Sequence, residues 1–578
     1  MADWQTHAVE NQVDEAVDYD LFSTDPALVA AVERAGAEAF RDRLVGQGTW
    51  LGRAETYALA AAANANGPTL ETFDPRGRRV DRVVFHPAWH EVLAKAREHG
   101  LVSLPFASNA RGRWSAWAAT FYLQGQVEAG VLCPATMTMA SIPVLRHEPR
   151  LWQALAGRLL DNGYDGGDRP LEGKGSIWVG MGMTEKQGGS DVRANSTTAV
   201  AEGHGGRGAA YCLRGHKWFF SVPMSDAHLV VARVADQGPS CFFVPRWLPD
   251  GRLNGVRIQR LKDKVGNRSN ASSEVEFQDA HGILVGEEGR GIPTIIEMAT
   301  YTRLNCVLGS AAILRQCLVQ AIWYARGRRA FGRLLVEQPL MRSVLADLAL
   351  ESEAALLLAM RLAAAFECDE PGATPAPSDD DVALARAWKR IMTPAAKFWV
   401  CKRSIELAGE AMEILGGNGY IDSGIMARLY REAPVNSIWE GSGNVMCLDV
   451  IRAIEREPAT WQALQADLER GASGSGATVS TGAGTGASAA DDRRLADCWA
   501  ELSEALAAPA DVRQALGRRI TERLVLAAQA VLMRRHAPGP VAEAFVASRL
   551  GARRGRIVGA LDPRAIDVEA LLERAFPR

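Results

Sequence analysis

The chain has 578 residues, of which 47% are hydrophobic and 23% charged, and its formal net charge is −3. At roughly 100–200 residues per domain this length predicts several domains, and the composition excludes a wholly disordered or fibrous chain. The near-neutral charge gives the molecule as a whole no strong electrostatic preference for a partner, so any affinity for nucleic acid has to come from a local patch.

The N-terminal residues and the cysteines predict the compartment. Residues 1–19 are acidic and contain neither the basic start nor the apolar run of roughly 7–15 residues that a secretory signal needs. No stretch approaches the 18 or more uncharged apolar residues that a membrane span requires. The nine cysteines include no CxxC pair, which favours a reducing compartment over a disulfide scaffold. We expect a cytoplasmic protein that does not contact a membrane.

Residues 1–174 are predicted to form an N-terminal helical domain. Asp25 and Pro26 are suited to the N-cap and the first position of a helix, and apolar residues then recur at helical spacing. His86 and His90 lie four residues apart and could share a helix face as metal ligands. Without further identifiable ligands the simpler interpretation is packing, with Pro87 in a first helical turn, and no metal site is predicted.

Residues 175–290 change to short β-rich runs divided by Gly, Pro and Asp clusters, among them Ser176–Met181, Leu229–Ala232 and Cys241–Val244. They predict an antiparallel sheet or barrel. The segment Gly203–Gly208 fits the pattern GxGxxG, but it lies between two strand-like runs rather than between a strand and a helix. It is therefore interpreted as a hairpin tip and not as a dinucleotide site.

Long helical segments return after residue 290. Residues 291–456 are predicted to form a four-helix bundle, with helices at about 292–326, 336–366, 380–412 and 434–456. Residues 457–490 are predicted to be a linker, because the part from 471 onward is almost only Gly, Ala, Ser and Thr. Residues 491–578 are predicted to be a separate, basic helical domain. The expected fold class is thus α+β and multidomain.

The C-terminal domain has a strongly basic segment. Residues 511–560 contain ten arginines and three acidic residues, which gives a net charge of +7. Such a patch could bind phosphates through counterion release. It could equally be a solvated helix face or a subunit contact. No lysine and no base-reading motif occur in this domain, so binding to DNA would be non-specific.

Five motifs contain candidate functional residues. In the first, Met181–Asp191, two glycines let backbone amides approach a ligand closely, and Thr184 and Ser190 add hydroxyl groups. Taken alone, it could be an ordinary turn that follows a strand. The other four motifs are His216–Ser221, Gly327–Gly332 followed by Gln338–Asp347, Leu415–Tyr420, and Ser437–Asn444.

Together with the order of the domains, these motifs resemble the acyl-CoA dehydrogenase flavoprotein family from about residue 20 to 456. The resemblance implies an FAD cofactor and an acyl-CoA thioester substrate, with Arg328 reaching the FAD pyrophosphate of a neighbouring subunit. Glu413 stands where many relatives have a glutamine, which leaves that cofactor contact open. The residues that the resemblance assigns to FAD are Met181, Met183, Thr184, Gly189, Ser190, Trp218, Phe220, Ser221, Arg328, Phe331, Gly417, Trp439, Ser442 and Asn444.

The resemblance also implies a catalytic base. Glu440 falls on the position of the base that removes a proton from the substrate. Some members of the family carry the base near the start of the bundle instead, and the matching residue here is Thr302, which is not a carboxylate. Glu440 is therefore the only carboxylate at a family base position, whereas without the resemblance it would read as a helix-start acid.

Within the family, the extra C-terminal length, Trp439 and the segment Lys262–Ala271 resemble the bacterial alkylation-response flavoproteins. That resemblance implies a homotetramer with weak acyl-CoA dehydrogenase activity that binds double-stranded DNA through its C-terminal domain. The alternative is a working FAD-dependent acyl-CoA dehydrogenase whose C-terminal domain serves assembly. The residues expected to meet DNA are Arg513, Arg518, Arg519, Arg523, Arg534 and Arg535.

Overall fold

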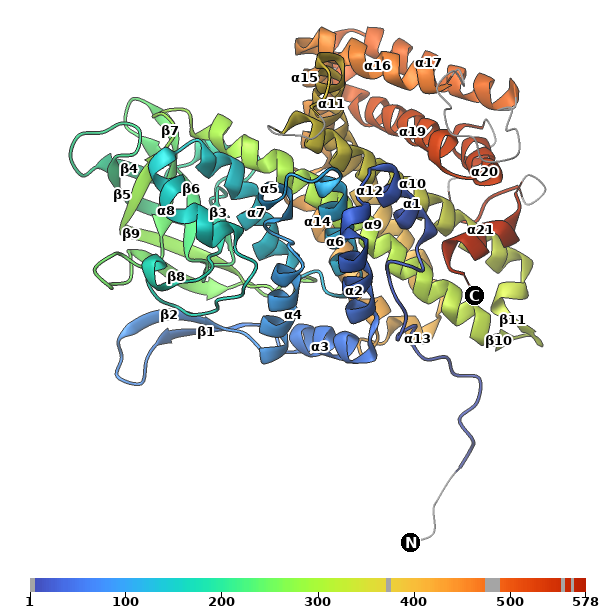
Figure 1. Cartoon of the computed structure of the whole chain (residues 1–578), viewed down its shortest axis with the longest axis horizontal. Coiled ribbons are helices and arrows are strands. Elements are labelled where there is room, and N and C mark those ends of the chain that lie inside the picture. Colours follow the sequence, from blue (N-terminus) through green and yellow to red (C-terminus); the bar gives the residue numbers. More distant parts are fainter. Residues whose placement is uncertain (1–5, 371–375, 473–488, 552–556, 563–565, 578) are drawn as a thin grey trace.

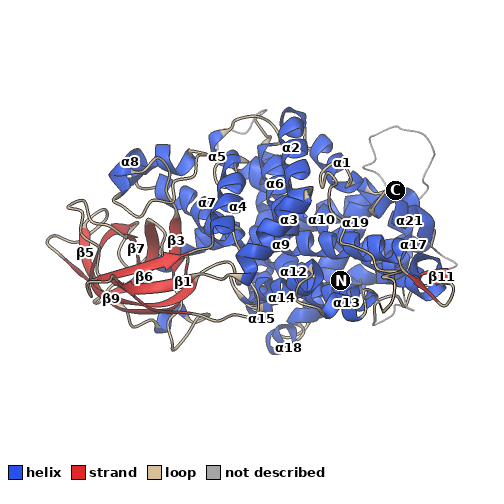
Figure 2. Cartoon of the chain, turned by 90° about the horizontal axis from the view of Figure 1, so that it is seen from below, coloured by secondary structure: helices blue, strands red, loops and turns tan. Residues whose placement is uncertain are grey.

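A β domain occupies one end of the molecule, and helices fill the rest (Figures 1 and 2). The structure is a computed structural model that describes residues 6–370, 376–472, 489–551, 557–562 and 566–577. The residues that precede the first helix run along the bundle, where Gln320 exchanges hydrogen bonds with both backbone groups of Ala16.

The N-terminal domain is built mainly from helices. They are α1 (Pro26–Arg34), η1 (Glu38–Phe40), α2 (Arg41–Gly52), α3 (Ala54–Ala65), α4 (Pro87–Glu98), α5 (Leu104–Ala107), α6 (Arg113–Val127), α7 (Leu132–Arg146), α8 (Pro149–Leu160) and η2 (Leu171–Gly173). The Asp25 side chain accepts a hydrogen bond from Leu28 N, and Pro26 follows it, so the predicted start of the first helix is confirmed.

An antiparallel hairpin of β1 (Thr69–Phe73) and β2 (Arg79–Val84) interrupts these helices and corrects the expectation of helices alone. Its strands carry Thr, Phe and Val, which favour extended backbone. Gly77 turns the chain at φ +76°. Directly after it, His86 caps α4 and His90 contacts the Tyr164 hydroxyl. No group of metal-ligating side chains gathers there or elsewhere in the described residues.

The β domain contains seven strands, most of them antiparallel. They are β3 (Val179–Gly182), β4 (Thr198–Ala201), β5 (Ala210–Ser221), β6 (Ala227–Val234), β7 (Gly238–Pro245), β8 (Val256–Leu261) and β9 (Ser272–Val285), with η3 (Val192–Ala194) between β3 and β4. The order is β3-β6-β4-β5-β9-β7, β8 adds to β9, and β7 also pairs with β6, so the sheet curls toward closure. Strands β3 and β4 pair parallel with β6, which the expectation of an antiparallel sheet did not include. Residues 203–208 form the predicted hairpin connection between β4 and β5.

The bundle follows the β domain. Its elements are α9 (Gly291–Gly327), β10 (Arg329–Ala330), β11 (Arg333–Leu334), η4 (Leu335–Glu337), α10 (Pro339–Asp369), α11 (Asp379–Ala387), a π-helical turn η5 (Trp388–Met392), α12 (Thr393–Ile414), α13 (Gly417–Tyr420), α14 (Ile425–Ile438) and α15 (Gly443–Arg456). Helix α9 is long and apolar enough to cross a membrane, but 94% of its most apolar window is buried inside the protein. It is the central core helix, packed against α6, α7, α10, α12 and α14.

Two predicted helices differ from the observed ones. The third predicted bundle helix, at about 380–412, is interrupted by the π turn just before Pro394. Proline has no N–H to continue a regular helical hydrogen-bond pattern. The fourth is two helices, α14 and α15, because Glu440 and Gly441 both have positive φ, at +60° and +105°. This backbone cannot continue a helix, and the break places the Glu440 side chain.

The C-terminal helices are α16 (Pro458–Ala472), α17 (Ala489–Ala507), α18 (Ala510–Ala515), α19 (Gly517–His536), α20 (Gly539–Leu550) and α21 (Val568–Ala575). Helix α16 corrects the expected start of the linker, since apolar residues such as Leu464 and Leu468 are wholly buried along it. Residues 473–488 lie outside the described residues. The C-terminal helices are packed on the bundle rather than separate from it (Figure 1). Arg549 forms ion pairs with Asp347 and Glu351 of α10.

Candidate active site

The turn between α14 and α15 is fixed by two cationic side chains. Lys397 of α12 donates from Nζ to the Trp439 carbonyl oxygen at 2.7 Å and also to the Gly441 carbonyl oxygen. Arg303 of α9 donates from Nε to the Glu440 carbonyl oxygen at 3.2 Å. The backbone on both sides of the Glu440 side chain is therefore held by the bundle, and Lys397, which no sequence motif singled out, is part of this arrangement.

The Glu440 carboxylate accepts a hydrogen bond from Thr302, with 2.6 Å between Oγ1 and Oε2. Burial raises the pKa of Glu440 above its ordinary value. The Thr302 hydrogen bond and the charges of Lys397 and Arg303 oppose part of that rise. A carboxylate with a raised pKa is a stronger base than an exposed one, as a proton-abstracting group requires.

Cys133, at the start of α7, contacts the β domain and lies near Glu440. Its thiol lies next to Ser221 and Asn270 and within electrostatic reach of Glu440 and Lys264. Burial raises the pKa of Cys133 to about 12, so the group is a neutral thiol at physiological pH. The end of β5 and the Glu440 turn therefore face a common region. Sequence reasoning missed Cys133, because one isolated cysteine in a helix gives no signal of this kind.

The outer face of β3 and β5 is suited to a flat ring. Met181 and Met183 are half-buried there, and Ser221 is half-buried at the end of β5. The Phe219 ring, two residues before Ser221, is 51% exposed. Side chains two residues apart in a strand share a face, so Phe219 and Ser221 together present an aromatic and a hydroxyl group. These residues fit the isoalloxazine of FAD.

Phe220 is wrong as a flavin contact. Its ring is wholly buried, stacks on His228 at a centroid distance of 4.0 Å and packs edge-on against Phe277. It belongs to the core of the β domain because it points to the opposite side of β5 from Phe219. Strict alternation from the buried Lys217 would have placed Phe219 inside, but a register shift between Lys217 and Phe220 reverses the two positions.

The Gly-rich loop after β3 is anchored by a buried ion pair. Lys217 Nζ lies 2.7 Å from Glu185 Oε1, and both side chains are inaccessible to solvent. Burial alone would raise the pKa of Glu185, but the Lys217 ammonium holds it at about 2. Around this anchor Thr184 is half-buried, and Gly189 and Ser190 are exposed, so these predicted cofactor groups remain free for a ligand.

Trp218 lies beside that loop. Its backbone N–H donates to the Thr184 carbonyl oxygen at 2.8 Å. The Lys262 ammonium lies 3.4 Å from the centroid of the indole ring, and Lys186 and Arg260 approach within 6 Å of the same ring. Glu274 pairs with Lys262 at 2.7 Å and with Arg260 at 2.8 Å, so the three cations and one carboxylate leave a net positive charge here, which suits the pyrophosphate of FAD.

The remaining predicted cofactor residues form two groups. Trp439, Ser442 and Asn444 lie at or next to the Glu440 turn. The segment with Arg328 and Phe331 lies at the β10–β11 hairpin, which both views place at the end of the molecule away from the β domain (Figures 1 and 2). Gly417 begins α13, in the turn after the exposed Glu413. Arg328 donates to the Asn11 carbonyl oxygen, and the Phe331 ring is 99% exposed.

Most of the six arginines predicted to bind DNA are engaged within the chain. Arg523 is wrong for that role, because its side chain is 4% exposed and pairs with Glu501 of α17 at 3.1 Å. A charge count within one segment misses acids that neighbouring helices supply. The other ion pairs are Arg513 with Glu455 (2.7 Å), Arg534 with Asp492 (2.9 Å) and Arg535 with Asp467 (3.1 Å).

Arg518 and Arg519, at the start of α19, are exposed. Arg519 has only a distant ion pair, at 3.5 Å from Glu501. Arg518 donates from Nε to Asn444 Oδ1 at 2.8 Å. One of the arginines predicted to bind DNA therefore contacts one of the residues predicted to bind the cofactor. Arg553, Arg554 and Arg556 of the basic segment lie outside the described residues.

Sequence comparison identifies the class of protein. Residues 180–280 match the acyl-CoA dehydrogenase middle domain, and residues 289–455 match the acyl-CoA dehydrogenase C-terminal domain. The chain belongs to the acyl-CoA dehydrogenase family, whose members are FAD-dependent oxidoreductases. Residues 11–166 match the N-terminal domain of the adaptive response protein AidB. Over 554 residues, 96% of each chain, the sequence is 45% identical to AidB of Escherichia coli strain K12.

Solved structures show the same fold. Caenorhabditis elegans ACDH-11, in complex with C11-CoA, superposes with a TM-score of 0.82 at 23% identity and covers 99% of this chain and 93% of its own. The apo form of Bd2924 gives a TM-score of 0.79 at 26% identity and covers 91% of this chain and all of its own. The predicted fold class is confirmed, with the C-terminal helices included in the superposed length.

Proposed function

We propose that this protein is an FAD-dependent acyl-CoA dehydrogenase in which Glu440 removes the α-proton of an acyl thioester. FAD, when bound, would supply the two-electron oxidant for the β-hydrogen, so that the substrate would lose two hydrogens in all and gain a carbon–carbon double bond. The observation that carries this proposal is the Glu440 carboxylate, which is partly buried, hydrogen-bonded by Thr302 and held by a turn that the bundle fixes on both sides.

The residues that would hold FAD come from both sides of the site. On the β domain, Phe219, Ser221, Met181 and Met183 would contact the ring, while Thr184, Gly189, Ser190 and Trp218 would lie toward the pyrophosphate. On the bundle, Trp439, Ser442 and Asn444 flank the base. The neutral Cys133 thiol and the half-buried methionines make the region weakly solvating, which favours the neutral acid form that Glu440 reaches after taking a proton.

We also propose a homo-oligomer, with a tetramer as the expected state. Arg328 and Phe331 lie at the opposite end of the molecule from the β domain, so they can reach an FAD only in another subunit. Large apolar side chains are exposed at this end, among them Leu340 (83%), Tyr420 (79%) and Phe331 (99%). Sedimentation should show an assembly, and Arg328→Ala should retain less FAD in it, because a charge-assisted phosphate contact is lost.

Glu440→Gln tests the dehydrogenase proposal. The amide keeps the size of the side chain and can still accept from Thr302, but it cannot take a proton. With FAD bound, anaerobic bleaching of the flavin by a panel of acyl-CoAs should fall by several orders of magnitude in the variant. Unchanged bleaching would exclude Glu440 as the base. A wild-type protein that no acyl-CoA reduces would reject the activity itself.

A second function, non-specific binding of double-stranded DNA in an alkylation response, is favoured by one observation. Arg518 and Arg519 are exposed side by side at the start of α19, in a chain that resembles an adaptive response protein. Two phosphate contacts per subunit predict that log K falls with log salt at a slope near −2, from roughly −0.9 per contact.

Reversal of both arginines to glutamate should weaken binding to every duplex sequence alike, because phosphate contacts carry no base information. Arg456→Glu combined with Arg493→Glu, which reverses the same number of charges at exposed positions on α15 and α17, is the matched control. If the duplex binds the double variant as tightly as it binds the wild type, or if the affinity does not depend on salt, the domain serves assembly instead.

A further inference from the structure

The residues that precede α1 are held against the C-terminal part of α9. We call residues 11–16 the N-terminal strap. The Trp323 indole donates to the Asp14 carbonyl oxygen at 3.0 Å. Val13 packs so closely on Gly327 that a Cβ at that position would lie 2.9 Å from Val13 Cγ2. Segments near a chain end are poorly ordered unless such contacts hold them, so the strap has a defined place on the bundle.

Asn11 attaches the strap to the β10–β11 hairpin. Its side-chain Nδ2 donates to the Arg329 carbonyl oxygen at 2.9 Å, and its Oδ1 accepts from the Arg329 N–H at 2.8 Å. The Asn11 carbonyl oxygen accepts a hydrogen bond from Arg328 Nη1. Asn11 has φ +55°, a left-handed conformation that asparagine adopts more readily than most residues. One residue therefore holds both the outer edge of β10 and the Arg328 guanidinium.

Gln12, the next residue of the strap, contacts the turn that contains Gly417. Gln12 Oε1 accepts from Asn418 Nδ2 at 3.1 Å, and the same amide group of Asn418 lies 3.3 Å from the Tyr324 hydroxyl. Asn418 directly follows Gly417 at the start of α13. The N-terminal strap thus contacts both segments at this end of the bundle that the family resemblance assigns to FAD.

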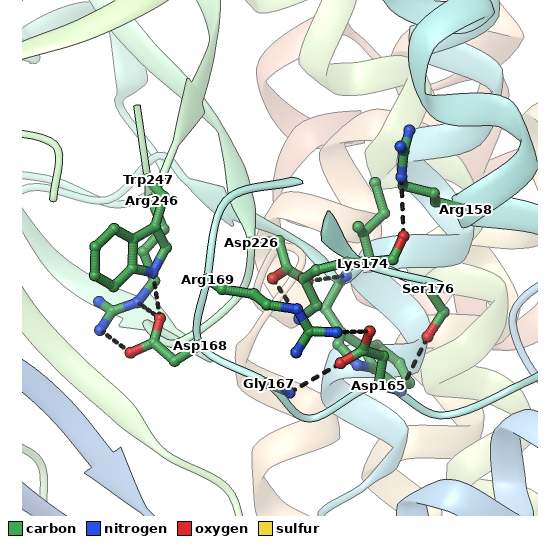
Figure 3. Close-up of polar contacts among 12 residues, drawn as sticks. Arg158, Asp165, Gly167, Asp168, Arg169, Lys174, Ser176, Asp226, Arg246 and Trp247 are labelled. Atoms are coloured by element: carbon green, nitrogen blue, oxygen red, sulfur yellow. Dashed lines mark hydrogen bonds and ion pairs between the residues drawn. The ribbon is translucent and has the colours of Figure 1, made fainter. Parts of the chain in front are cut away.

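The Arg328 guanidinium keeps donors for an anion. Beside the loop that leads into β3, an arginine is neutralised by a carboxylate, since Arg246 pairs with Asp168 at 2.8 Å (Figure 3). Arg328 has no such carboxylate partner in the part of the chain that the structure describes, and the Asn11 carbonyl oxygen is its acceptor there. A carbonyl oxygen fixes one N–H without neutralising the charge. The Nε–Nη2 edge of Arg328 is left for two parallel hydrogen bonds to a phosphate.

We infer that Asn11 is a positioning residue that orients the Arg328 guanidinium toward the FAD pyrophosphate of another subunit. The inference rests on the proposal that Arg328 meets that FAD, and it adds a residue that no sequence motif singled out. A long side chain that is free in solution loses rotamer freedom when its ligand binds. If the side chain is already fixed before the ligand arrives, this cost does not reduce the affinity.

Equilibrium dialysis of the holoenzyme against graded FAD concentrations tests the inference. Asn11→Ala removes both side-chain hydrogen bonds to Arg329 and should raise the dissociation constant of FAD roughly three- to tenfold. Asn66→Ala is the matched control, because Asn66 is also an exposed asparagine that donates to a backbone carbonyl oxygen, that of Ala62 at 2.9 Å. It lies directly after α3, which both views place away from the β10–β11 hairpin (Figures 1 and 2). The control variant should bind FAD like the wild type.

The double variant of Asn11→Ala and Arg328→Ala distinguishes positioning from a merely structural role. Because Asn11 acts through Arg328, the double variant should bind FAD as weakly as Arg328→Ala alone, and no more weakly. An equal loss of affinity from Asn11→Ala with and without Arg328 would overturn the inference. An unchanged affinity in Asn11→Ala would overturn it as well, and tighter binding would mean that the strap competes with FAD for Arg328.

Two further results separate this inference from the proposals on which it rests. If Arg328→Ala binds FAD like the wild type, the assignment of Arg328 to FAD is wrong and the role of Asn11 falls with it. If Arg328→Ala loses affinity and Asn11→Ala does not, only the role of Asn11 is wrong. Sedimentation of Asn11→Ala should match that of the wild type. An assembly that dissociates in Asn11→Ala and persists in Asn66→Ala would make the strap an assembly element and overturn its positioning role.

Discussion

Thr302 Oγ1 lies 2.6 Å from Glu440 Oε2, so the two positions at which the family resemblance predicts a catalytic base touch each other in this chain. One position holds the carboxylate and the other a hydroxyl that donates to it. Since α9 supplies Thr302 and the α14–α15 turn supplies Glu440, the Glu440 carboxylate is oriented by a core helix in addition to its own turn.

The hydrogen bond from the Thr302 hydroxyl lowers the pKa of the Glu440 carboxylate. Because this bond favours the ionised carboxylate, Thr302→Val should raise the pKa of Glu440 further. If Glu440 is the base, it acts when deprotonated, and the acidic limb of acyl-CoA-dependent flavin reduction should therefore move to higher pH. Stopped-flow bleaching across pH measures it. Thr302→Ser, which keeps the hydroxyl, should show the wild-type profile; an unmoved limb in the valine variant would contradict this role.

Two adjacent phenylalanines should behave oppositely. Phe219→Ala removes an exposed ring from the flavin face and should weaken FAD retention with little change in thermal unfolding. Phe220→Ala removes a ring from the core and should cost about 3–5 kcal/mol of stability. Fluorescence of released flavin and the unfolding midpoint of each variant give the two readings. The reverse pattern would restore Phe220 as the flavin contact.

Glu432 makes stability depend on pH. Burial, with a contribution from the Glu128 charge, raises the pKa of Glu432 to about 7, whereas an unfolded glutamate titrates near 4.3. Between these values the folded protein keeps a proton that the unfolded chain has lost. Stability therefore falls as pH rises through this range, by an amount on the order of 3 kcal/mol.

Glu432→Gln removes that dependence while keeping an oxygen for the Asn267 N–H. Its unfolding midpoint should be near that of the wild type at pH 5 and higher than it at pH 8. Calorimetry at both pH values is the measurement. A midpoint difference that is the same at both would mean that Glu432 does not carry the proton.

The C-terminal helices are attached to the bundle by a buried charge cluster. Arg549 is 11% exposed and faces Asp347 and Glu351, which are 7% and 4% exposed. Arg549→Met leaves carboxylates buried beside a lost cation and should destabilise the protein by about 3–5 kcal/mol. Arg78→Met breaks an exposed pair with Asp74 and should cost less than about 1 kcal/mol. Equal unfolding midpoints for the two variants would show that the cluster contributes nothing.

The sequence predicted the features that local patterns carry. Gly and Ser around Glu440 mark a loop that family motifs align with the base, and Asp25-Pro26 marks a helix start. It did not predict which side of β5 faces a ligand at Phe219 and Phe220, because a bulge between Lys217 and Phe220 disturbs the alternation.

The sequence also did not predict the contacts between segments that lie far apart in the chain. The arginines of α19 lie within one helix and indicate a free basic patch when only the sequence is considered. Three of them, however, pair with Glu501, Asp492 and Asp467, which come from α17 and α16. In the same way, nothing in the sequence places Cys133 between Ser221 and Glu440, or Lys397 under the Glu440 turn, since these pairings arise only from packing of whole helices.

The hydrogen bond from Arg518 to Asn444 couples the C-terminal helices to the proposed flavin site. Asn444 lies four residues from Glu440, and a phosphate that takes up the Arg518 guanidinium would release the Asn444 amide. Coupling between two sites is reciprocal. The amount by which a ligand at α19 changes the free energy of binding beside Asn444 therefore equals the amount by which a ligand beside Asn444 changes the free energy of binding at α19. If α19 binds duplex DNA and Asn444 contacts the flavin, as proposed, the flavin potential should differ between the free and the DNA-bound protein.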